Sequence, residues 1–98
     1  MTFSQARLLR LSPEDNVLVA LTELKTGDGA AVGDARISVC EDIPSGHKVA
    51  ARAIAAGEKI IKYGVPIGSA TRAIAIGSHV HTHNLRSDYL PGPLEQSA

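Results

Sequence analysis

Short apolar segments separated by glycine turns recur along this chain. One spacing is repeated: an apolar residue, two other residues, a glycine, two other residues and a second apolar residue. Glycine supplies the positive φ angle that a tight turn needs, and the flanking apolar residues anchor both sides of the turn in a core. The repeat predicts a compact body of short strands joined by similar turns. It occurs at residues 43–49, 54–60 and 74–80, with a weaker copy at 24–30.

The hydrophobic pattern between these turns predicts strands. Residues 17–21 form a continuous apolar run, typical of a central strand, and residues 36–40 alternate so that Ile37 and Val39 face inward. The alanines before Gly57 favour helix by propensity, which allows a short helical turn there. The fold class is therefore mainly β, with at most one or two short helical turns. Strands are expected at residues 17–21, 36–40, 47–53, 59–63 and 78–84, and a loop at 64–68.

The composition fits a single small globular domain. The chain has 98 residues, 44% hydrophobic and 20% charged, and a chain of this length buries less than about 70% of its unfolded surface. Aromatic residues are scarce, so Val, Ile, Leu and Ala must build a thin core, and we expect a homo-oligomer or a permanent partner. Because the formal net charge is zero, nothing predicts an electrostatic grip on nucleic acid.

The single cysteine, Cys40, excludes an internal disulfide and a cysteine-based metal cluster within this chain. We expect it to be a reduced, half-buried strand residue. No apolar run approaches the roughly 20 residues of a membrane span, and the N-terminal residues lack the apolar stretch of a signal peptide. A cytoplasmic protein without membrane contact is expected. Its expected organisation is a lead-in at 1–12, one domain at 13–88 and a flexible tail at 89–98.

Three histidines at alternate positions are the main candidates for chemistry: His79, His81 and His83. Alternation is the period of a strand, so an extended segment points all three imidazoles to one face. Imidazole binds metals and moves protons near neutral pH. A row of histidines can also be a solvated strand face without any ligand, and that interpretation stays open.

Geometry limits how many of these imidazoles can bind one ion. Neighbouring histidines lie roughly 7 Å apart along a strand, and the outer two roughly 13 Å. Zinc-like ions bind nitrogen at about 2.0–2.1 Å. Adjacent pairs can therefore converge on one ion, but all three can do so only if the strand bends. We favour His81 and His83, because Thr82 and Asn84 mark that end as a strand exit.

Two further segments place polar side chains beside tightly turned backbone. His47 and Lys48 directly follow the turn glycine Gly46, and Lys62 and Tyr63 precede a glycine-rich loop. The lysines can neutralise a carboxylate, and the tyrosine can donate a hydrogen bond. Alternatively, these are ordinary surface lysines, Tyr63 lies at the edge of the core, and His47 has no ligand.

Several of these segments follow one another in a characteristic order. They are Asp15-Asn16-Val17, Asp42-Ile43-Pro44-Ser45-Gly46-His47-Lys48, Lys62-Tyr63-Gly64 with Pro66-Ile67-Gly68, and Val80-His81-Thr82-His83-Asn84. This ordered set resembles the N-terminal domain of the altronate dehydratase family, a small SAF-type (antifreeze-like) domain with a β-clip fold. The resemblance covers about residues 13–86. The small subunit of sulfolactate sulfo-lyase is similar too, and galactarate dehydratase is a more distant match.

The resemblance implies a hydro-lyase that eliminates water from a sugar acid. It also implies a divalent metal, iron as Fe²⁺ or else Mn²⁺, bound with help from a partner. His81 and His83 would bind the metal or carry protons. The site residues that it implies are His47, His81 and His83 as catalytic residues, and Lys48, Lys62, Tyr63 and Asn84 as substrate-binding residues.

In altronate dehydratase the small domain precedes a much larger one, whereas this chain stops at Ala98. We therefore expect a separate small subunit, or an excised piece, that needs a larger catalytic partner. One alternative is the alpha subunit of sulfolactate sulfo-lyase, in which sulfite leaves instead of water. Another is a non-enzymatic module that holds a carbohydrate or a metal.

Overall fold

The computed structural model describes residues 7–32 and 35–88, and all regular structure in that part of the chain is β. No helix there could cross a membrane. The expectation of a mainly β fold is confirmed, whereas the helical turn before Gly57 does not form. The strands are β1 (Leu8–Leu9), β2 (Val17–Ala20), β3 (Gly29–Val32), β4 (Ala35–Ser38), β5 (Lys48–Ala50), β6 (Lys59–Lys62), β7 (Val65–Ala70), β8 (His79–Val80) and β9 (Leu85–Ser87).

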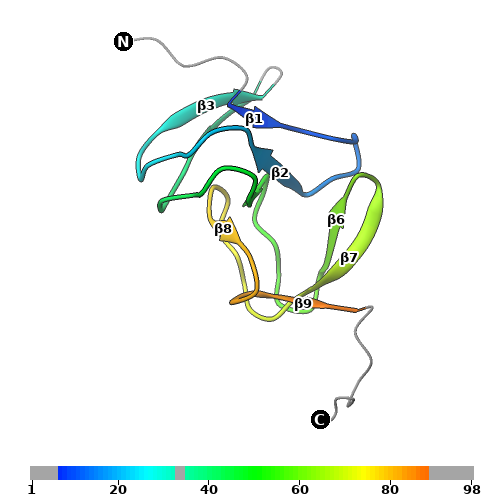
Figure 1. Ribbon diagram of the computed structural model, residues 1–98. Helices are drawn as coiled ribbons and strands as arrows, with labels where there is room; N and C mark the ends of the chain where they lie inside the picture. Colours follow the sequence, from blue (N-terminus) through cyan, green and yellow to red (C-terminus); the bar gives the residue numbers. More distant parts are fainter. Residues whose placement is uncertain (1–6, 33–34, 89–98) are drawn as a thin grey trace.

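These strands form three small antiparallel sheets. The largest has the order β1-β2-β5-β8, a second consists of β3 and β4, and the third has the order β6-β7-β9. Figure 1 shows β1 and β3 at one end of the molecule and β9 at the other. The first strand lies within the expected lead-in at 1–12, and the expected tail at 89–98 lies outside the described residues.

The glycine repeat builds the turns that join these sheets. In all four copies the glycine has a φ between 84° and 89°, the left-handed value that glycine tolerates best. The apolar residues that open the copies pair with each other, Leu24 with Ile43 and Ile54 with Ile74, through reciprocal backbone hydrogen bonds of 2.8–2.9 Å. The predicted anchoring of these turns in the core is confirmed, because the apolar residues of the repeat are buried on both sides of each glycine.

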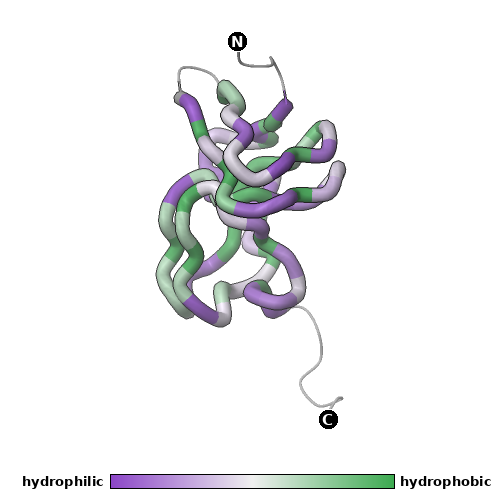
Figure 2. The backbone as a smooth tube through the Cα atoms, turned by 90° about the vertical axis from the view of Figure 1, so that its left-hand side faces the viewer, coloured by the Kyte–Doolittle hydropathy of each residue, from purple (hydrophilic) through white to green (hydrophobic). Residues whose placement is uncertain are grey.

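Each bridged pair of turns belongs to its own hydrophobic cluster. Leu24 and Ile43 lie in the first cluster, and Ile54 and Ile74 lie in the second. Strand β5 serves both, because Val49 packs in the first cluster and the next residue, Ala50, packs in the second. Figure 2 shows hydrophilic residues on projecting loops and hydrophobic segments within the body. The histidine-bearing strand β8 is therefore held against the strand that links both cores.

Three local predictions were wrong. Residues 64–68 are not a loop, because most of them lie in β7, where Pro66 opposes Ile61 at an irregularity of the register. The strand expected at 78–84 is only β8, and the chain turns over residues 82–84. Cys40 is exposed and follows the end of β4, and its thiol lies 3.2 Å from the Ile76 carbonyl oxygen.

Two buried polar residues, Asp15 and Asn16, fasten the β6–β7 hairpin to the start of β2. The Asp15 carboxylate accepts hydrogen bonds of 2.8 Å from the backbone N–H groups of Tyr63 and Gly64. Both residues have positive φ angles, 58° and 74°, as a two-residue hairpin loop requires. The Asn16 amide donates to the Lys59 carbonyl and accepts from the Ile61 N–H, both at 2.8 Å.

Candidate functional site

The pairing of β5 with β8 brings histidines from distant parts of the chain together. Val49 opposes His79, and Lys48 opposes Val80. If this register is extended by one residue, His47 opposes His81. Side chains of directly opposed residues in an antiparallel pair point to the same face of the sheet. His47 and His79 are 32 residues apart in sequence, and the pairing of two short strands brings them close in space.

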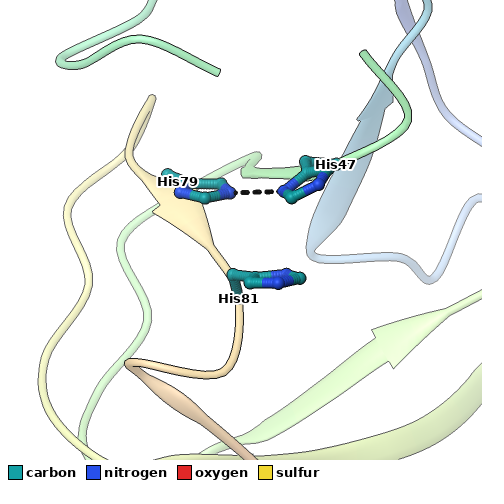
Figure 3. A group of neighbouring side chains, drawn as sticks. All are labelled: His47, His79 and His81. Carbon is teal, nitrogen blue, oxygen red and sulfur yellow. Dashed lines mark hydrogen bonds between the residues drawn. The ribbon is translucent and has the colours of Figure 1, made fainter. Parts of the chain in front are cut away.

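The imidazoles of His47, His79 and His81 form one group, which we call the histidine triad. Each offers a ring nitrogen, and the three nitrogens lie within 4.8 Å of one another. The His47 Nδ1 and His79 Nε2 atoms are 2.8 Å apart, so one ring donates its N–H to the other. The rings stack with centroids 4.4–5.4 Å apart, and Figure 3 shows them gathered beside β8.

His83, which we paired with His81 from the sequence, lies beside the triad but not within it. Its ring centroid is 5.3 Å from that of His79, with the rings tilted by 40°. His79 is in the triad instead, because the chain turns after His81 rather than continuing as a strand. The pairing of β8 with β5 places His81 near His47, which alternation within a single strand does not predict.

The triad is half-buried, and the surroundings of His79 and His81 favour their neutral forms. Burial, followed by the nearby His47, lowers the pKa values of His79 and His81. The Glu41 carboxylate, which accepts a hydrogen bond of 3.0 Å from the His79 backbone N–H, opposes this shift at His79. A lowered pKa keeps the ring lone pairs free at neutral pH, and a metal can bind only the unprotonated form.

Lys48 adds positive charge near the triad, and Lys62 lies close enough to Lys48 to repel it. Burial, and then the charge of Lys62, lowers the pKa of the half-buried Lys48, and Lys48 in turn helps to lower the pKa of His81. Within residues 7–32 and 35–88, neither lysine forms an ion pair. A half-buried cation without a counter-ion beside neutral imidazoles can accept an anionic group from outside.

The remaining predicted site residues have different surroundings. Tyr63 is 72% exposed at the tip of the β6–β7 hairpin, and its ring contacts no histidine ring in the described part of the chain. Asn84 is buried, and its side chain bonds to the backbone of His79 and His81. Sequence reasoning did not single out Glu41, for which no local motif gives a signal.

The donor set of the triad fits a first-row transition metal. Nitrogens around a tetrahedral ion at about 2.0–2.1 Å lie roughly 3.4 Å apart. The triad nitrogens, which lie within 4.8 Å of one another, would reach such positions by side-chain adjustments that replace the His47–His79 hydrogen bond. Imidazole suits Fe²⁺, Zn²⁺ and Cu²⁺, whereas Mn²⁺ is better matched by oxygen ligands. Of the two ions implied by the resemblance, the triad therefore fits Fe²⁺ better.

Comparison with known proteins shows which proteins the chain is similar to. The chain is 39% identical over 80 residues to altronate dehydratase of Bacillus subtilis and 42% identical over 80 residues to altronate dehydratase of Escherichia coli. Each match covers 82% of this chain but only 16% of the relative. The alpha subunit of (2R)-sulfolactate sulfo-lyase from Paracoccus pantotrophus is 46% identical over 54 residues, which are 55% of this chain and 81% of that subunit.

A family profile, described as the altronate/galactarate dehydratase SAF domain, matches residues 6–88. This range contains every strand of the structure, the triad, Lys48 and Lys62. The chain therefore belongs to the altronate/galactarate dehydratase SAF domain family.

Proposed function

We propose that this chain is the small component of an altronate dehydratase-type hydro-lyase, which removes water from a sugar acid. The observation that carries the proposal is the convergence of three imidazoles beside unpaired cations in a member of this family. The triad is only half-buried, so a larger catalytic region must cover it to exclude water from a substrate. The altronate dehydratase relatives are much longer than the matched segment, which supports such a region.

The lysines supply the binding site for the acid group. A sugar acid carries a carboxylate at neutral pH, and Lys48 and Lys62 offer two positive charges without an acidic partner among the described residues. Binding of that carboxylate relieves the repulsion between the two ammonium groups. It also places the carbon beside the carboxylate, whose proton must leave, near His81, whose pKa reflects the charge of Lys48.

The triad supplies the metal ligands. His47, His79 and His81 would hold Fe²⁺, with the remaining positions open to the substrate and to groups from the larger region. When bound, such an ion stabilises negative charge on the substrate oxygens as a Lewis acid. His83 lies outside the triad, next to His79, and is the candidate for carrying a proton to or from the substrate.

A chimera tests this function. Residues 6–88 of this chain would replace the matching segment of the Bacillus subtilis altronate dehydratase. The chimera is expected to release water from altronate and to lose this activity when His81→Ala is introduced. The matched control is Glu23→Gln, an exposed residue paired with Lys25, which should retain activity. A folded chimera that is inactive on altronate would overturn the proposal.

A second candidate is the elimination of sulfite from sulfolactate. It is favoured by the 46% identity to the Paracoccus pantotrophus alpha subunit. Sulfite leaves without protonation, whereas hydroxide needs an acid or a metal. His83→Ala should therefore impair water elimination strongly and sulfite elimination only slightly. An equivalent chimera can be built on the sulfo-lyase. If that chimera releases sulfite while the first chimera is inactive on altronate, the second candidate is established instead.

A further inference from the structure

We propose that Asn84 is a positioning residue that fixes two members of the histidine triad relative to the third. The inference rests on the proposed function, in which the triad holds a metal. The Asn84 residue is only 5% exposed. Its Oδ1 atom accepts a hydrogen bond of 2.9 Å from the His81 N–H, and its Nδ2 atom donates one of 2.9 Å to the His79 carbonyl oxygen.

These two bonds close the turn that carries the histidines. The backbone contributes as well, because the N–H groups of Asn84 and Leu85 donate to the His81 carbonyl oxygen at 3.0 and 2.8 Å. The Asn84 side chain is the element that joins the backbone of His79 to that of His81 across the turn. Together with the pairing of β8 with β5 and the Glu41 hydrogen bond to the His79 N–H, it therefore fixes how far apart, and in which directions, the two imidazoles leave the backbone.

An asparagine is the side chain that this place requires. The amide presents one acceptor and one donor at a fixed spacing, and the turn offers one N–H and one carbonyl. Aspartate has no donor when ionised and would face the His79 carbonyl with a negative charge. Leucine has a similar volume but leaves both backbone groups without a partner, and a buried unpaired group costs about 1–3 kcal/mol.

The third member of the triad is positioned independently of Asn84. The His47 carbonyl accepts a hydrogen bond of 2.9 Å from the Ala20 N–H, and the His47 N–H donates one of 3.1 Å to the Pro44 carbonyl. Loss of the Asn84 amide should therefore displace His79 and His81 while His47 stays in place. Metal affinity depends on the relative positions of all three nitrogens, and loss of groups that orient ligands typically weakens binding by about 10–100-fold.

The chain offers a matched control in Asn16. That residue is 2% exposed, and its amide also makes one donor and one acceptor bond to the backbone, with Lys59 and Ile61 at 2.8 Å. It fastens the β6–β7 hairpin rather than the histidine turn. If Asn84 only stabilises the fold, then Asn84→Ala and Asn16→Ala should behave alike.

The experiment compares both variants with the wild-type chain, with Co²⁺ as the probe. Urea unfolding should show that both variants are less stable. Under conditions in which all three proteins are folded, Asn84→Ala is expected to bind Co²⁺ at least about tenfold more weakly and to change the visible absorption of the bound ion. Asn16→Ala is expected to match the wild type. Equal affinities and spectra for all three proteins would overturn the proposal.

A measurement without metal separates this inference from the proposed function. If the wild-type chain alone binds no Co²⁺, binding needs the groups that the larger region supplies, but ring positions can still be read from NMR contacts between the imidazole protons of His47 and His81. These contacts should persist in Asn16→Ala and vanish in Asn84→Ala. If Asn84→Ala does not fold, Asn84→Asp takes its place. It keeps the acceptor for His81 but loses the donor to the His79 carbonyl oxygen, so in this variant the contacts between the imidazole protons of His47 and His79 are the ones expected to vanish. Contacts of wild-type strength in the folded Asn84 variant would sink the inference.

Discussion

At the scale of single residues, Lys48 occupies an unfavourable place for a cation. Burial and the charge of Lys62 both lower its pKa, and no acidic side chain among the described residues compensates for either. Residues that destabilise a fold in this way are frequently retained for function. The same substitution should therefore have opposite effects on stability and on binding.

We predict that Lys48→Met stabilises the chain and weakens substrate binding. The free energy of unfolding should rise by up to about 0.5 kcal/mol, because the charge is partly solvated and its removal relieves only a screened repulsion. In the chimera, the KM for altronate should rise at least about tenfold, which corresponds to about 1.4 kcal/mol. Urea unfolding and steady-state kinetics measure the two effects.

Lys25→Met is the control for this prediction. Lys25 is exposed and pairs with Glu23 at 3.0 Å, so its loss should slightly lower stability and leave KM unchanged. A Lys48→Met chimera with the wild-type KM would show that this lysine does not bind the acid group.

The sequence was informative about which residue types carry chemistry and less so about how they meet. His47 and His81 were identified, and the structure brings them together. The exchange of His83 for His79 in the triad depends on a bend after His81. That bend is held by the buried side-chain amide of Asn84 and by backbone hydrogen bonds to the His81 carbonyl oxygen, local interactions that the alternation of histidines does not reveal. Asn84 was expected to contact the substrate, which stays a prediction, but its amide is occupied by backbone groups.

At the scale of elements, the glycine turns were predictable because their spacing and their conformation have one local cause. The strand boundaries were less so. Residues 64–68 contain a proline and two glycines, which suggested a loop, yet Gly68 lies in β7 where an added Cβ would meet the Arg86 carbonyl of β9. A glycine that permits close packing of strands looks the same in sequence as one that ends a strand.

The turn glycines give a matched pair for a stability prediction. Gly27 and Gly77 have φ angles of 89° and 85°, but an added Cβ meets nothing within 4 Å at Gly27 and collides with the Ser38 carbonyl at Gly77. Gly27→Ala should therefore cost only the left-handed conformation, about 1–2 kcal/mol. Gly77→Ala should cost about 1–3 kcal/mol more because of overpacking.

Urea unfolding measures both variants. Because Gly77 lies two residues before His79, its substitution should also disturb the triad, whereas Gly27→Ala should leave the imidazole NMR signals of the triad unchanged. Equal losses of stability for the two variants would contradict the close packing of this turn against the end of β4.

At the scale of the whole molecule, acidic side chains support the turns. Hydrogen bonds from backbone or side-chain donors lower the pKa values of these carboxyl groups. The carboxylates of Asp28 and Glu58, for example, accept hydrogen bonds from backbone N–H groups within their own turns. The groups concerned are Asp28, Asp42, Glu58 and Asp88. Since the unfolded chain then takes up protons at a higher pH than the folded chain does, acid should weaken the fold.

We predict that stability falls gently as the pH drops below about 7, because the lowered pKa values of His79 and His81 let the unfolded chain take up protons first. It should fall more steeply as the pH drops through and below about 4, the range of ordinary carboxyl pKa values. The urea midpoint measured between pH 7 and pH 2.5 tests this. Asp88→Asn removes a carboxylate that pairs with Lys59 at 2.6 Å, so its curve should start lower and fall less steeply. A midpoint that rises on acidification would contradict the prediction.

The two hydrophobic clusters share β5, and this has a consequence for how the molecule opens. Val49 and Ala50 are both inaccessible to solvent, yet each belongs to a different cluster. Neither half can come apart without exposing one of these neighbours, so both should melt in a single step, and the β5 amides should be the slowest to exchange with deuterium. His47 immediately precedes this slow-exchanging strand. The histidine triad should therefore come apart only when the entire fold opens.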